Sequence, residues 1–283
     1  MVNSLRIFPI IGVVIFIIII LFAFIYSIPI IFIRRFHQHN NILTLNICLV
    51  TILCCLSWLF IHATITIDDP YTTLGKMNFF FYITAMIFTI QVPFSFLAAS
   101  IHRCCSIVYH TKVFFKTKRW IMLCIGSQWL LGFILSTPDF VRIYLPKGDF
   151  LWPKIYALTS VMIIPSTIYL ITNILIYYHV RSSSRRIQPQ TIFHNVQQIK
   201  ISRRDIYLLR HIILMFCVFV TGWAPTSILP IVNHFTYVNI LLYGVSTIWC
   251  ELALLINIID LYLYNHKVRK YLKSSCLQCC TKF

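Results

Sequence analysis

Seven long apolar stretches, separated by short polar segments, dominate the hydrophobicity pattern of this chain. Each is about as long as the 20 or so residues that an α-helix needs to cross a hydrocarbon core of about 30 Å. Barrel strands would instead alternate apolar and polar positions. We therefore expect an all-α membrane protein, a single seven-transmembrane helix bundle over residues 1–283. The expected spans are residues 7–33, 42–66, 77–108, 120–138, 152–180, 206–232 and 237–264.

Composition agrees with a membrane protein. Of 283 residues, 59% are hydrophobic and only 11% are charged, whereas a soluble domain of this size needs far more polar surface. The net charge is +17, but the basic residues lie between the apolar spans rather than on one face. This placement favours membrane orientation over nucleic-acid binding.

The basic residues also predict the orientation. The segments on one side of the seven spans hold 17 lysines and arginines, and the segments on the other side hold 5. Because basic loops remain in the cytoplasm, we expect the N-terminus outside and the C-terminus inside. As a separate expectation, the membrane is the plasma membrane.

The last segment combines basic residues with cysteines. Residues 265–280 combine basic and apolar residues in a pattern that predicts a short amphipathic eighth helix. We expect this helix to lie along the inner leaflet, in contact with membrane lipid. Cys276, Cys279 and Cys280 are candidates for lipidation, although free cytosolic thiols are the alternative. None of the eleven cysteines falls in an expected outer segment, so the sequence predicts no extracellular disulfide framework.

Several short motifs occur in a fixed order on these spans. A lone arginine ends the third span, a tryptophan lies in the fourth and a proline in the fifth. The sixth span carries a motif with two aromatic residues and a proline, and the seventh a motif with an asparagine, an aspartate and a tyrosine. The motifs are Leu45-Asn46 in the second span, His102-Arg103-Cys104, Trp129, Pro165, Phe219-x-x-Gly222-Trp223-x-Pro225, and Asn257-x-x-Asp260-x-Tyr262.

In this order and spacing the chain resembles the rhodopsin-like (family A) G-protein-coupled receptors, as a divergent orphan-type member. The resemblance covers essentially the whole chain. It implies a receptor that transduces an unknown extracellular ligand, a peptide or small molecule, to a heterotrimeric G protein. It also implies no cofactor and no enzymatic activity.

The resemblance further implies a switch for activation and G-protein coupling. Its residues are His102, Arg103, Pro165, Asp205, Phe219, Trp223, Pro225, Asn257, Asp260 and Tyr262. Pro225 removes a backbone hydrogen bond and kinks the sixth span, so its inner half can move as a lever that Trp223 controls. The alternative is a core tryptophan in a kinked helix. Arg103 is expected to pair with Asp205 in the resting state, although Asp205 has arginines on its own helix as competing partners. His102 stands where the family carries an acid.

The ligand pocket is expected in the outer half of the bundle. The position of the amine-binding aspartate is Ala85 and that of the retinal-binding lysine is Glu251, so neither monoamines nor retinal are supported. An acid inside a membrane span is costly, and Glu251 is either a ligand contact or a protonated acid bonded to a neighbouring helix. The candidate pocket residues are Ala85, Met86, Thr89, Ser227 and Glu251.

Other function classes fit less well. The runner-up is a non-signalling seven-helix protein, a transporter or a partner subunit, but no inverted repeat or midplane charged pair is evident. The sequence has no metal-ligand cluster, nucleophile elbow or phosphate-binding loop, so we expect neither an enzyme nor a metal site. Scattered histidines such as His37 and His62 are interpreted as interfacial.

Overall fold

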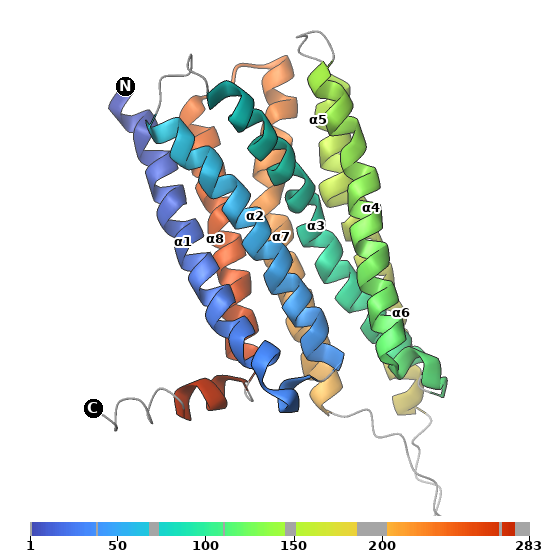
Figure 1. Ribbon diagram of the computed structural model, residues 1–283. Coiled ribbons are helices and arrows are strands. Elements are labelled where there is room, and N and C mark those ends of the chain that lie inside the picture. The colour runs from blue at the N-terminus through green and yellow to red at the C-terminus, as the bar shows by residue number, and fades with distance from the viewer. Residues whose placement is uncertain are drawn as a thin grey trace, which may run out of the picture.

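The chain folds into seven long helices that stand side by side, as expected (Figure 1). This computed structural model describes residues 2–37, 39–67, 74–109, 111–144, 151–185, 203–265 and 268–274, and no strand occurs among them. The helices are α1 (Val2–Phe32), α2 (His39–Ile67), α3 (Leu74–Val108), α4 (Lys118–Tyr144), α5 (Leu151–Leu158), α6 (Ile164–Arg185), α7 (Arg203–Phe235) and α8 (Ile240–Tyr264), where α5 and α6 form one span. Short 3₁₀ turns, η1 (Arg34–Phe36) and η2 (Val113–Lys116), follow α1 and α3.

The helices bury one face against each other and expose large apolar side chains on the other. In α1, Ile15, Ile19 and Ala23 are buried, whereas Val14 and Leu21 are more than half exposed. Seven spans are long and apolar enough to cross a membrane, and exposed apolar surface of this extent is stable only in lipid. The protein is therefore a multi-pass membrane protein with the predicted fold class.

The third span is the most central. Helix α3 packs against α2, α4, α6 and α7, and α1 closes the other side through contacts with α2 and α8 (Figure 1). Residues that α3 carries consequently reach most of the other spans.

The fifth span contains a wide turn that the sequence did not predict. Residues Thr159–Ile163, labelled η3, form a π-turn between α5 and α6, in which the backbone N–H of Ile164 bonds to the carbonyl of Thr159. Pro165 follows directly and lacks an N–H, so a regular α-helix would leave the carbonyl four residues earlier without its donor. The π-turn lies where this proline interrupts the ladder.

The seventh span starts three residues later than expected. Asn239 caps α8, since its Oδ1 accepts a hydrogen bond of 3.0 Å from the backbone N–H of Leu241. An asparagine in this position satisfies a free N–H group at the helix end, so Tyr237 to Asn239 lie outside the helix.

The short eighth helix covers residues 268–274 of the expected 265–280. It is amphipathic, because Val268 is fully buried while Lys270 and Lys273 are exposed. Asn265 at the end of α8 joins this helix to the bundle. Its Nδ2 donates to Tyr26 Oη at 2.9 Å and to Asn41 Oδ1 at 3.3 Å, and its carbonyl accepts a hydrogen bond of 2.9 Å from the N–H of Arg269. The lipidation candidates Cys276, Cys279 and Cys280 lie outside the described residues.

Candidate functional site

A buried acid and a histidine meet between three helices. The side chains of His62 on α2 and Glu251 on α8 are only 11% and 3% exposed, and His62 Nε2 lies 3.8 Å from Glu251 Oε1. The ring of Phe16 on α1 contacts His62 edge-on, with 5.5 Å between centroids. Gly12 makes room, since a Cβ atom there would lie 2.7 Å from His62 Nδ1 and 2.8 Å from Glu251 Oε1.

This pair is short of hydrogen bonds. Neither oxygen of Glu251 nor Nδ1 of His62 has a hydrogen-bond partner among the described residues, and 3.8 Å exceeds hydrogen-bond length. Buried polar groups normally find partners, and those that do not are costly. A carboxyl group without donors is chemically suited to accept hydrogen bonds from a cationic group that enters the bundle. His62 was expected to be interfacial. It lies two residues before the end of its span, and its ring is buried beside Glu251.

The other expected pocket residues are only partly brought together. Thr89 on α3 is buried and accepts a hydrogen bond of 3.0 Å from Trp58 Nε1. Trp58 in turn packs edge-on against His62, with 6.3 Å between ring centroids, so Thr89 is linked to the pair through one side chain. Ala85 is fully buried. Met86 and Ser227 are partly buried, and neither of them donates a hydrogen bond to the Glu251 carboxyl group.

The expected switch aromatics form a stack on α7. The rings of Phe219 and Trp223 are nearly parallel with centroids 5.5 Å apart, and Phe96 on α3 contacts Phe219 at 6.0 Å. All three are buried. Trp223 Nε1 has no hydrogen-bond partner among the residues that the structure describes. Pro225 follows two residues later inside the same helix.

Below the stack, α6 is attached to both α7 and α3. Tyr169 and Phe216 stack with ring centroids 3.8 Å apart, and the hydroxyl groups of Ser100 and Thr172 lie 3.0 Å apart. Pro165, one turn before Tyr169, is buried. The expected switch prolines on α6 and α7 therefore both lie within a turn or so of a buried aromatic contact.

The end of α3 holds the expected coupling residues. His102 is buried and Arg103 is partly buried, with the backbone carbonyl of Arg103 accepting a hydrogen bond of 2.9 Å from Ser106. Asp205 belongs to the first turn of α7, but its side chain lies outside the described part. The pairing of Arg103 with Asp205 stays a prediction.

The three expected switch residues of α8 differ in environment. Asn257 is 2% exposed, and its amide nitrogen and oxygen have no hydrogen-bond partner among the described residues. Asp260 is partly buried. Tyr262 lies near the C-terminal end of α8 and lines a groove shared with residues 268–274.

A closed ring of hydrogen bonds joins α2, α3 and α4, and sequence reasoning missed it. Asn46 Nδ2 donates to Gln128 Oε1 at 2.6 Å, and Gln128 Nε2 donates to Gln91 Oε1 at 3.1 Å. Gln91 Nε2 then donates to the carbonyl of Trp129 at 3.1 Å, and Trp129 Nε1 donates to Asn46 Oδ1 at 3.2 Å. Asn46 and Trp129 stand out in the sequence as motif residues, but nothing in it pairs them.

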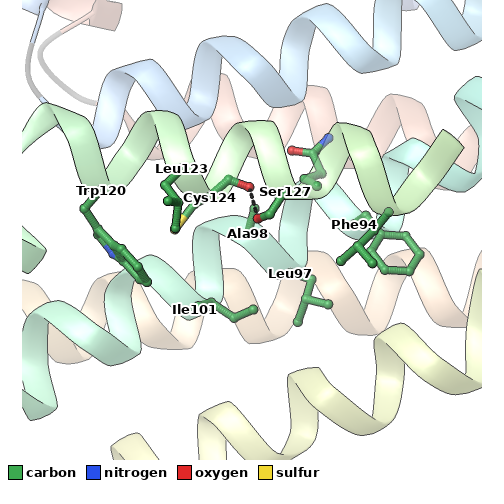
Figure 2. A pocket seen from close by; sticks show the side chains of 10 residues that line it. Phe94, Leu97, Ala98, Ile101, Trp120, Leu123, Cys124 and Ser127 are labelled. Carbon is green, nitrogen blue, oxygen red and sulfur yellow. Dashed lines mark hydrogen bonds between the residues drawn. The ribbon is translucent and has the colours of Figure 1, made fainter. Parts of the chain in front are cut away.

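A small pocket lies beside this ring, between α3 and α4. Figure 2 shows that Leu97 and Ile101 from α3 lie near Trp120 and Leu123 from α4. Its volume is about 100 Å³, which is below the roughly 300 Å³ of a typical ligand pocket. The one polar contact drawn, Ser127 donating to the carbonyl of Cys124 at 3.0 Å, stays within α4 (Figure 2). This pocket does not coincide with the expected ligand site.

Comparison with known proteins assigns no family. No model of a known protein family matches the sequence, and no curated protein matches it either. Among the described residues, no group of three or more histidine, cysteine or acidic side chains could hold a metal ion.

Proposed function

We propose that this chain is a divergent rhodopsin-like G-protein-coupled receptor of the plasma membrane, with its N-terminus outside and its C-terminus in the cytoplasm. In this proposal a ligand enters the outer half of the bundle, and a heterotrimeric G protein binds at the opposite end. The coupling end is that of Arg103, and the basic segments there agree with a cytoplasmic location.

The observation that carries the proposal is the aromatic stack on the proline-containing helix α7. Phe219 and Trp223 stack on each other, and Phe96 contacts Phe219 from α3. Phe96 precedes Arg103 by seven residues, which is two helical turns or about 10 Å. A movement of Trp223 can therefore reach the coupling end through side chains in contact and through one rigid helix.

The buried pair supports a ligand with a cationic group. Glu251 offers two carboxyl oxygens without hydrogen-bond partners among the described residues, and His62 with its aromatic neighbours forms one wall beside them. Desolvating such an acid is costly, and a bound cation would offset that cost. A cationic peptide or guanidinium compound fits this chemistry.

A screen with a promiscuous G-protein readout tests the function. Cells expressing the full chain should respond to at least one extracellular compound, and Arg103→Ala should abolish the response at unchanged surface expression. Glu251→Gln should lower the potency of a cationic agonist. If Glu251→Gln leaves potency unchanged, the acid is structural. If compounds are instead transported, and Arg103→Ala transports them equally, the runner-up, a non-signalling seven-helix transporter, replaces the receptor.

The resting-state ion pair of Arg103 and Asp205, which we call the latch, and the proposed orientation are each tested separately. An accessible ion pair contributes about 1 kcal/mol or less, so Asp205→Asn should raise ligand-independent signalling by at most about fivefold. Unchanged basal signalling in a responsive receptor would contradict this ion pair.

The orientation is tested with epitope tags. A tag before Val2 should be stained on intact cells, and a tag after Phe283 only after permeabilisation.

A further inference from the structure

At the end of the bundle that carries residues 268–274, a groove lies between α1, α8 and these residues. Its volume is about 660 Å³, several times that of the pocket between α3 and α4. Figure 1 shows the short C-terminal helix directed away from the bundle, near the ends of α1 and α8. Tyr262 is the one expected switch residue among the described lining residues. None of the expected pocket residues and no residue of α3 lines the groove.

The groove has a basic rim. Arg269, Lys270 and Lys273 line it, and none of the described residues that line it is acidic. Lys270 and Lys273 are exposed. Arg269 uses Nη1 to donate to the carbonyl of Leu263 at 3.1 Å, which leaves other N–H donors of its guanidinium group to bind an anion. The rim therefore suits a phosphate group.

The other wall of the groove is apolar and belongs to the lipid-facing side of α1. Phe22 and Ile25 line the groove and are 41% and 49% exposed. With Ile11, Val14 and Ile18 they follow the spacing of three and four residues that forms one stripe along a helix. An acyl chain can lie along this stripe toward the middle of the membrane.

The walls are held in place before any ligand binds. Asn265 joins the end of α8 to Tyr26 on α1 and to Asn41 on α2, and Val268 is fully buried in the core. Tyr271 contacts Phe36 edge-on with 5.8 Å between ring centroids. Because these walls are already ordered, little conformational entropy is lost when a ligand binds, which favours affinity.

We propose that this groove is a binding site for one anionic glycerophospholipid, whose phosphate group is bound by Arg269, Lys270 and Lys273 and whose acyl chain packs on Phe22 and Ile25. A basic pocket between membrane helices binds anionic headgroups in this way. The apolar wall distinguishes a lipid from a soluble phosphate, which would leave Phe22 and Ile25 uncovered. Only the choice of leaflet, the inner one, depends on the proposed orientation.

Native mass spectrometry of the full chain in detergent tests the headgroup contacts, with dioleoylphosphatidylserine as the probe and dioleoylphosphatidylcholine as the neutral reference. The wild type should bind the anionic lipid more tightly. Arg269→Gln/Lys270→Gln/Lys273→Gln should weaken it tenfold or more, since each basic residue near an anionic headgroup contributes about fivefold. Because Arg269 also bonds to Leu263, the variant Lys270→Gln/Lys273→Gln provides a second test on exposed residues only.

The matched control removes three exposed basic residues at the same end of the bundle but outside the groove, as Lys112→Gln/Lys118→Gln/Arg119→Gln. It should change the affinity by less than about twofold. Equal losses in both triple variants would show unspecific charge attraction and overturn the site, as would equal binding of the two lipids by the wild type.

Two further arms test the acyl chain. Glycerophosphoserine has the same headgroup without chains and should not displace the lipid, and displacement at similar concentrations would mean that the groove binds a soluble phosphate. Phe22→Ala should weaken lipid binding about twofold to fivefold through lost apolar contact. Phe24→Ala, which removes an exposed phenylalanine that does not line the groove, should leave it unchanged.

Discussion

Two buried polar clusters in this bundle satisfy their hydrogen bonds to opposite degrees. In the ring of Asn46, Gln91, Gln128 and Trp129, four hydrogen bonds of 2.6 to 3.2 Å close on themselves. In the pair of His62 and Glu251, the two side chains lie 3.8 Å apart, and both carboxyl oxygens have no hydrogen-bond partner among the described residues.

We interpret this difference as one of role: the ring holds the helices together, and the pair belongs to the proposed ligand site. A satisfied polar network in a low-dielectric interior fixes the position of the helices that share it, here α2, α3 and α4. An unsatisfied carboxyl group lowers stability, and such groups persist where function requires them. We therefore expect substitutions in the ring to affect folding and substitutions in the pair to affect ligand response.

The largest loss of stability should follow from breaking the ring. Asn46→Leu removes two of the four hydrogen bonds and leaves Gln128 Oε1 and Trp129 Nε1 without their partner, at a cost of about 1–3 kcal/mol. The apparent melting temperature of the purified protein in detergent should fall by several degrees. Thr137→Val is the control, because the exposed Thr137 donates only to the carbonyl of Phe133 in its own helix. Equal melting temperatures for the two variants would contradict a scaffold role.

A smaller loss should follow from crowding the ring. A Cβ atom at Gly132 would meet the end of the Gln91 side chain, which two hydrogen bonds hold in place. Gly132→Ala should therefore cost about 1–3 kcal/mol, the usual range for overpacking, and lower the melting temperature. Gly126 lies on the same helix with nothing within 4 Å of its added Cβ, so Gly126→Ala should be neutral or slightly stabilising.

The same substitution beside the pair should have a much smaller effect on stability. A Cβ atom at Gly12 would lie 2.7 Å from His62 Nδ1 and 2.8 Å from Glu251 Oε1. Neither of these two atoms has a hydrogen-bond partner among the described residues, so both side chains can move away. Gly12→Ala should therefore change the melting temperature less than Gly132→Ala, while it shifts the potency of an agonist that contacts Glu251. A loss of stability as large as that of Gly132→Ala would mean that the pair is rigid.

The spans were predictable because each is continuous and apolar. The run over residues 42–66 matches α2 (His39–Ile67) to within three residues at either end, since a lipid environment allows the backbone little other than a helix. The π-turn at Thr159–Ile163 was not predictable, because many prolines kink a helix without producing one. The start of α8 was also missed, although Asn239 carries the chemistry of an N-cap.

The candidate site was predictable only as single residues. Glu251 is conspicuous as an acid in a membrane span, and Trp223 and Pro225 follow from a motif. The partners are not encoded locally: His62 lies 189 positions before Glu251 in the chain, and Asn46 bonds to Gln128 across 82 positions. Which side chains meet depends on the packing of the helices, and the hydrophobic pattern does not determine that.

The most direct test of this distinction is the apparent melting temperature of Glu251→Leu, measured on the full chain in detergent beside the wild type and Asn46→Leu. Replacing an unsatisfied buried acid by an apolar side chain of similar size is often neutral or stabilising. The account predicts a melting temperature equal to or above that of the wild type. A fall of several degrees, comparable with that of Asn46→Leu, would show that Glu251 holds the fold together and would contradict its assignment to the ligand site.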